Sequence, residues 1–206
     1  AGLPDDIENN VLAIIGEGAS YANSDTGWTG SLMDFEALHG YWIITDSDIS
    51  FSYDLDSLEP LSRKVNPYQT DHIPYGFDYI QSTQQAFYFV DEITLLDGNV
   101  EVGDWLLSYN GDVLTGIRQW QGMMIDIPTM GASDDVLTTD YFVEGDIPTF
   151  KLLKQSTGEF LALDGEIFTY KHEGFWSCMD TLREKIKLEQ LDDTYYGYGY
   201  EVKINN

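Results

Sequence analysis

Two aspartates separated by one residue, Asp46 and Asp48, have the spacing in this sequence that best suits metal binding. Carboxylates at alternate positions of a loop can face one hard cation, as they do in calcium-binding loops. No D-x-D-x-D-G loop with a distal glutamate follows, and in a chain with 36 acidic residues a solvated acidic surface is the competing interpretation. The sequence is therefore compatible with a stabilising Ca²⁺ ion, for which two further groups are candidates: Asp91, Glu92, Asp97 and Asn99, and Ser133, Asp134 and Asp135.

Arg118 and Trp120 are the candidate ligand-binding residues. They follow an Asn110-Gly111 turn on the second strand of a predicted hairpin, and strand alternation places both on one face. Trp120 stands between two glutamines, so we predict an exposed ring that stacks on a sugar, while Arg118 holds a carboxylate. The competing interpretations are a surface salt bridge for Arg118 and a core position for Trp120.

The other tryptophans in apolar runs fit a core better than a binding platform. Trp42 precedes Ile43-Ile44, and Trp105 precedes Leu106-Leu107, so we predict that both rings are buried.

Catalytic side chains do not form a recognisable pattern. His39, His72 and His172 are far apart and lack metal-ligand spacing. No Gly-x-Ser-x-Gly motif or Ser–His–Asp arrangement is present, and 36 acids do not single out a glycosidase pair. No catalytic residue is therefore predicted.

One segment nevertheless points toward sugar-nucleotide chemistry. The string Lys-His-Glu-Gly-Phe-Trp-Ser-Cys-Met-Asp-Thr-Leu-Arg at 171–183, within residues 168–191, resembles the C-terminal segment of the glucose-1-phosphate cytidylyltransferases. Such sugar nucleotidyltransferases hold a triphosphate with a Gly-rich loop and a cation. Here the first strand-like run, 11–15, is followed by Gly16-Glu17-Gly18, and no Lys or Arg occurs before Arg63. We interpret 168–206 as a borrowed or truncated tail; the alternative is the relic of an enzyme.

Charge limits the partners of the chain. Its 206 residues carry a formal net charge of −26, and residues 1–62 contain twelve acidic residues and no Lys or Arg. Such a field repels nucleic acid and anionic membranes, so neither is expected as a partner. With 43% hydrophobic residues the chain can bury a core, and its lone Cys178 excludes an internal disulfide. No apolar run is long enough for membrane insertion.

Short strands separated by turn signals dominate the chain. Apolar runs at 40–44, 85–90, 105–109, 113–117, 123–127 and 149–153 alternate with Gly- and Asn-containing turns. A Thr181-x-x-Glu184 capping box predicts one helix over about 181–191. The predicted fold is mainly β, with antiparallel β-sandwich-like modules and one short C-terminal helix. The predicted parts are a small β module (1–58), a linker (59–75), a β-sandwich module (76–167) and a helical tail with a Tyr/Gly-rich end (168–206).

Residues 10–165 carry a second resemblance. Gly27-Trp28-Thr29-Gly30, Gly103-Asp104-Trp105 and Gly145-Asp146-Ile147-Pro148 are similar to repeat modules of large secreted and cell-surface proteins of marine bacteria. The resemblance implies a β-rich extracellular module and brings no catalytic residues with it. The predicted function is thus a non-catalytic extracellular or cell-surface module for adhesion or ligand binding, with a glycan or a protein as partner.

Overall fold

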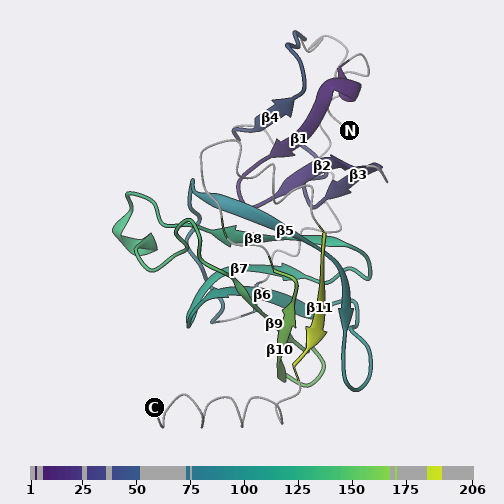
Figure 1. Cartoon of the computed structure of the whole chain (residues 1–206), viewed down its shortest axis with the longest axis vertical. Helices are drawn as coiled ribbons and strands as arrows, with labels where there is room; N and C mark the ends of the chain where they lie inside the picture. The colour runs from purple at the N-terminus through teal and green to yellow at the C-terminus, as the bar shows by residue number, and fades with distance from the viewer. Residues whose placement is uncertain are drawn as a thin grey trace. The chain divides into compact units, whose positions relative to one another are not determined.

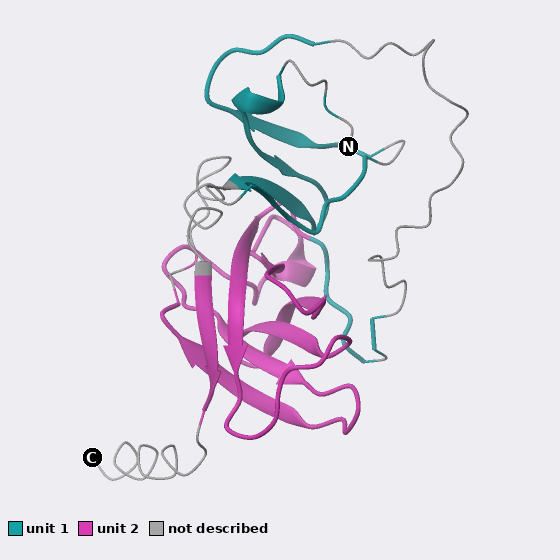
Figure 2. Ribbon diagram, turned by 90° about the vertical axis from the view of Figure 1, so that its right-hand side faces the viewer, with its two compact units in different colours: residues 1–81 teal, residues 82–206 magenta. Residues whose placement is uncertain are grey.

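The structure, a computed structural model, describes residues 3, 7–24, 27–35, 39–51, 73–74, 76–167, 170 and 185–191. Two compact units divide the chain, residues 1–81 and residues 82–206, and they are coloured separately in Figure 2. Both units are built from β-strands, so the predicted mainly β fold is confirmed. The predicted linker, 59–75, lies outside the described residues except for positions 73–74.

The first unit is a small antiparallel sheet preceded by one 3-10 turn. Its strands lie in the order β3-β2-β1-β4. Alternate residues of β1 explain the pairing, because Ala13 lies between Ala22 of β2 and Ile44 of β4, and all three side chains are buried. The elements are η1 (Glu8–Asn10), β1 (Val11–Ile15), β2 (Ser20–Ser24), β3 (Gly27–Gly30) and β4 (Trp42–Thr45).

The second unit is a seven-stranded mixed sheet in the order β7-β6-β9-β10-β11-β5-β8. Every neighbouring pair is antiparallel except β11 and β5, which run parallel (Figure 1). Its elements are β5 (Gln85–Thr94), β6 (Trp105–Asn110), β7 (Val113–Gln119), β8 (Ile125–Met130), η3 (Val136–Thr138), β9 (Thr149–Leu153), β10 (Phe160–Gly165) and β11 (Lys185–Gln190).

The two outermost strands of this sheet, β7 and β8, come close to each other. A side chain at Gly116 of β7 would collide with the carbonyl oxygen of Pro128 in β8. That oxygen accepts a hydrogen bond from Ser108 Oγ at 3.0 Å. Pro128 suits an outermost strand, since proline has no N–H to donate to a further neighbour. The sheet therefore curls until its edges meet, which gives a barrel-like form.

The β6–β7 hairpin forms where the sequence predicts it. Asn110 pairs with Val113, so the two-residue turn consists of Gly111 and Asp112 and not of Asn110 and Gly111. Gly111 has φ +58°, a conformation that glycine adopts at low cost.

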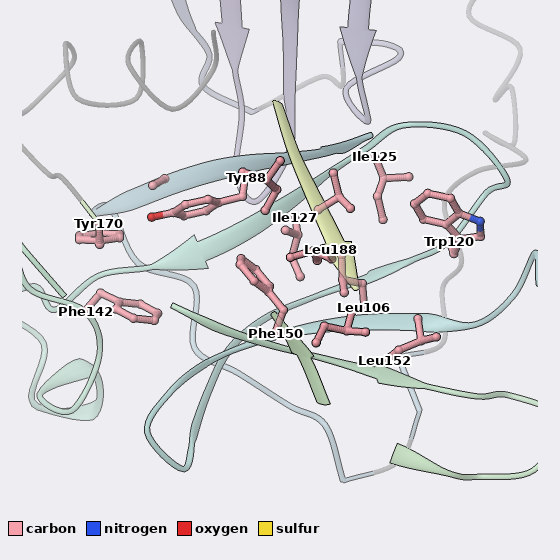
Figure 3. Packing of buried hydrophobic residues seen from close by; sticks show 14 residues of the cluster. Tyr88, Leu106, Trp120, Ile125, Ile127, Phe142, Phe150, Leu152, Tyr170 and Leu188 are labelled. Atoms are coloured by element: carbon pink, nitrogen blue, oxygen red, sulfur yellow. The ribbon is translucent and has the colours of Figure 1, made fainter. Parts of the chain in front are cut away.

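Inward-facing side chains from six strands fill the barrel-like unit (Figure 3). Tyr88 of β5 and Phe150 of β9 meet edge to face with ring centroids 5.6 Å apart. Phe142 stacks on Tyr170, centroids 5.3 Å apart, and closes one end of the core. Burial raises the pKa of the Tyr88 hydroxyl, so this phenol stays protonated at all physiological pH values.

The predicted C-terminal helix over 181–191 is wrong where the structure describes it. Residues 185–190 form β11, an interior strand between β10 and β5. Ile186 and Leu188 enter the core, while Lys187 and Glu189 are exposed, which is the two-residue period of a strand. Burial of these two side chains outweighs the helix preference of the Lys- and Glu-rich segment. Within the segment interpreted as a borrowed or truncated tail, residues 185–190 are thus part of the sheet of the second unit.

Candidate functional site

Trp120 is not the exposed ring that the sequence predicts. Only 7% of it is accessible, and it packs in the core beside Ile125 (Figure 3). Its backbone bridges two segments, because the Trp120 N–H donates to the Asp104 carbonyl at 2.7 Å and the Trp120 carbonyl accepts from the Gly103 N–H at 3.0 Å. The flanking glutamines misled the prediction, since Gln119 extends to the Gly103 carbonyl instead of marking a solvated strand end.

Arg118 makes the salt bridge of its competing interpretation, but with a buried partner. Its Nε donates to the Asp126 carbonyl oxygen at 2.8 Å, and its Nη2 lies 3.7 Å from Asp126 Oδ2. The Asp126 side chain is 1% exposed, so the guanidinium neutralises a buried carboxylate across the β7–β8 seam. Arg118 and Trp120 therefore do not form a ligand clamp.

A second buried carboxylate joins the loops at the same end of the barrel. Asp104 is bound by Lys154 Nζ at 2.6 Å and by the backbone N–H groups of Glu101 and Gln155. Lys154 also donates to the Asn99 carbonyl at 2.9 Å. This network ties the β5–β6 loop to the β9–β10 loop, and the Gly-Asp-Trp string was its only sequence signal.

Of the two tryptophans that the sequence predicts to be buried, one is buried and the other is exposed. Trp105 is buried, as expected, on β6. Trp42 is 43% exposed on β4, so its predicted burial is wrong. The short β4 is an outermost strand of a four-stranded sheet, and such a strand does not bury every apolar residue of its run.

The metal candidates do not converge on one point. Asp46 Oδ1 accepts hydrogen bonds from Ser47 Oγ at 2.9 Å and from Asn10 Nδ2 at 3.2 Å, and these two bonds, that of Ser47 first, lower the pKa of Asp46. Asp48 is exposed on the surface. Across the described ranges, no group of three or more His, Cys, Asp or Glu side chains is arranged to hold a metal ion.

In each of the other two calcium candidate groups, one carboxylate has a structural role. Asp135 Oδ1 accepts from the Leu137 N–H at 3.0 Å and caps η3. Glu92 Oε2 accepts from Lys187 Nζ at 2.7 Å, and this hydrogen bond and charge lower the pKa of Glu92. The pair lies in an open groove of about 520 Å³ over β5, β10 and β11, where Lys187 is the only lysine among the lining residues.

The β8–β9 loop, residues 131–148, presents a set of apolar side chains that sequence analysis missed. Figure 1 shows this loop as the green segment that projects beyond the sheet at the left. Four apolar residues along it are more than half exposed: Val136 (81%), Leu137 (65%), Val143 (56%) and Ile147 (59%).

Hydrogen bonds around η3 fix the first half of the loop. Asp135 caps the 3-10 turn that carries Val136 and Leu137. Thr138 is fully buried; its Oγ1 donates to the Asp135 carbonyl at 2.9 Å and accepts from the Ser133 N–H at 3.0 Å. Val136 and Leu137 are thus exposed on a turn whose backbone is held by hydrogen bonds.

Buried aromatic rings fix the second half. Phe142, 1% exposed, exchanges backbone hydrogen bonds with Met130 and Ala132, and its ring stacks on Tyr170. The backbone of Tyr170 bonds to residues 145 and 146, and the Asp146 carboxylate accepts from the Val143 N–H at 2.9 Å. Val143 and Ile147 are therefore exposed on a backbone that is anchored in the core.

Acidic residues alternate with these apolar residues along the loop. The loop contains no Lys or Arg, and its exposed or half-exposed carboxylates are those of Asp134, Asp135, Asp140, Glu144 and Asp146. Exposed apolar side chains with carboxylates close to them in the chain suit contact with another macromolecule.

The sequence signal for this surface was weak. Val136 and Leu137 follow an N-capping aspartate without the alternation of a strand or the length of an amphipathic helix. Only the position of the loop beyond the sheet shows that the core does not take up these side chains.

No known protein family, curated protein or solved structure matches this chain. Within the described ranges, no helix combines the length and apolar character needed to span a bilayer.

Proposed function

We propose that this chain is a non-catalytic binding module of an extracellular or cell-surface protein, and that the β8–β9 loop is its contact surface. The observation that supports the loop is the exposure of Val136, Leu137, Val143 and Ile147 on a backbone held by capping hydrogen bonds and buried aromatic rings. The extracellular location is inferred from the resemblance of residues 10–165 to secreted repeat modules, and this location stays a prediction.

Rigid exposed apolar side chains are useful to a binding protein. Burying one Val or Leu side chain is worth about 1.5–3 kcal/mol, and here that energy is available only to a partner. Because the loop backbone is already fixed, little conformational entropy is lost when the partner docks.

The buried charges of the second unit support a structural rather than a catalytic role. Asp104 and Asp126 are the charged side chains found buried in the described part of the chain, and each is paired with a cation. Both pairs join strands or loops, and neither carboxylate faces the groove over β5, β10 and β11.

The proposal is tested by adhesion of coated particles. Fluorescent particles carrying the whole chain are passed over surfaces coated with glycans, acidic proteins or basic proteins. We expect retention on at least one class of surface, and loss of that retention for particles carrying Val136→Ser/Leu137→Ser.

The matched control is Val102→Ser/Met123→Ser, which changes two equally exposed apolar residues outside the β8–β9 loop. We expect it to be retained like the wild type. Equal retention of the wild type and the Val136→Ser/Leu137→Ser variant on every surface would remove the loop as the contact surface.

The enzyme alternative has its own assay. Incubation of the chain with CTP, glucose 1-phosphate and Mg²⁺ is expected to release no pyrophosphate. Pyrophosphate release that scales with the concentration of the chain would replace the binding module with a sugar nucleotidyltransferase.

A further inference from the structure

We infer that the partner of the β8–β9 loop is a protein surface with an apolar centre and a periphery of Lys and Arg. This inference rests on the proposed function, because it names the partner of the same loop. It is carried by the combination of four exposed apolar side chains with acidic neighbours and no cation along residues 131–148.

The apolar side chains indicate that the partner is more than a charged polymer. Val136 and Leu137 are among the most exposed large apolar residues of the described chain. A polycation without apolar groups would leave both in water and gain nothing from them. The centre of the partner surface is therefore apolar.

The acidic residues of the loop set the charge of the partner. Asp134 and Asp135 precede the exposed Val136 in the chain, and Glu144 follows Val143, so exposed carboxylates are close in sequence to both apolar residues. An acidic partner would bring like charges together, whereas Lys and Arg would pair with these carboxylates at the edge of the contact. Arg is also enriched at protein interfaces.

The net charge of the chain argues against the other candidate partners of the loop, which are a second copy of the chain, anionic lipid and nucleic acid. A second copy would carry the same −26, and two such molecules repel each other. Anionic lipid and nucleic acid are repelled for the same reason. A basic protein is attracted over a distance of about a Debye length, roughly 8–10 Å at physiological salt, which accelerates its encounter with the loop.

The test is selection from a displayed library with a balanced starting composition. A small three-helix scaffold carries one face randomised over Leu, Phe, Tyr, Ser, Lys, Arg, Asp and Glu, with acidic and basic codons in equal number. Phage are selected on the whole chain and depleted on Val136→Ser/Leu137→Ser, which keeps the net charge. Depletion removes binders that respond only to negative charge.

Enriched binders are expected to combine apolar residues at the centre of the face with an excess of Lys and Arg over Asp and Glu. Their affinity for Val136→Ser/Leu137→Ser should be at least tenfold lower, about 1.4 kcal/mol, and unchanged for Val102→Ser/Met123→Ser. Their association rate should fall as NaCl is raised.

Two results would overturn the inference in different ways. Loop-dependent binders with no excess of Lys and Arg would refute the basic partner and leave the proposed contact surface standing. Failure to recover any binder that distinguishes the wild type from Val136→Ser/Leu137→Ser would remove both. Equal melting temperatures of the three proteins verify that each variant is folded.

Discussion

Trp120 stabilises the second unit at the point where β7 ends and the chain turns toward β8. Its ring lies in the core, and its backbone bonds to residues 103 and 104. Replacing it with alanine removes a large buried side chain and leaves a cavity, which typically costs about 3–5 kcal/mol.

We predict that Trp120→Ala lowers the free energy of unfolding of the second unit by about that amount, measured by urea denaturation. Phe160→Ala is the control, because Phe160 on β10 is 47% exposed. The decrease in the free energy of unfolding should be clearly smaller for Phe160→Ala than for Trp120→Ala. A Trp120→Ala variant as stable as the control would mean that the ring contributes little to the core.

The Glu92–Lys187 pair predicts a pH dependence at the level of single side chains. The hydrogen bond and charge of Lys187 lower the pKa of Glu92, and those of Glu92 raise the pKa of Lys187. A lowered carboxyl pKa stabilises the fold above the unfolded pKa, and this contribution is lost as pH falls through the folded pKa. The raised lysine pKa gives stability that is lost as pH rises through the folded lysine value.

Lys187→Gln should therefore move the pKa of Glu92 upward, toward its ordinary value, in an NMR titration of the carboxyl carbon. The effect on stability should be small, since both side chains are exposed, and should vanish in acid. An unchanged Glu92 titration would show that the pair does not persist in solution.

At the scale of elements, β11 holds the second sheet together. It lies between β10 and β5 and buries Ile186 and Leu188. Removing it opens two interior strands and exposes two aliphatic side chains, each worth about 1.5–3 kcal/mol. The two side chains together account for about 3–6 kcal/mol. This is a large part of the about 5–15 kcal/mol by which native domains are stable, and the backbone hydrogen bonds to β10 and β5 are lost as well.

We predict that deletion of residues 168–206 abolishes the cooperative thermal transition of the second unit, followed by near-ultraviolet circular dichroism. A chain that ends after Leu191 retains every described strand and serves as the control. Retention of the transition in the chain that lacks residues 168–206 would support the interpretation of this segment as a borrowed or truncated tail.

At the scale of the whole molecule, the net charge of −26 opposes compaction. Mutual repulsion of the carboxylates raises the free energy of the folded state, and salt screens it. We predict that the melting temperature rises with NaCl up to moderate concentrations. A melting temperature that does not respond to NaCl would show that self-repulsion is negligible.

The same melting-temperature measurement is repeated with CaCl₂. Stabilisation by Ca²⁺ stays a prediction, and a specific site would make the melting temperature depend on Ca²⁺ at constant ionic strength. Identical melting curves in CaCl₂ and in ionic-strength-matched NaCl would show that Ca²⁺ acts by charge screening and not at a specific site. Asp46→Asn/Asp48→Asn tests the candidate ligands if the curves differ.

Sequence patterns by themselves determined the local structure and the charge of this protein. Short apolar runs at 85–90 and 149–153 indicated strands, and Gly111 marked the β6–β7 turn, because these signals depend on neighbours in the chain. The acidic field also follows from composition alone.

Tertiary structure decided which side chains are covered. Ile186 and Leu188 form a strand because β5 and β10 offer a place in the sheet, which overrides a helix-forming composition. Trp120 is buried because the sheet curls over it, and the side chains of Val136 and Leu137 are exposed because their loop extends beyond that sheet. Burial depends on residues distant in the chain, so neither the burial of Trp120 nor the exposure of Val136 and Leu137 could be predicted from local spacing.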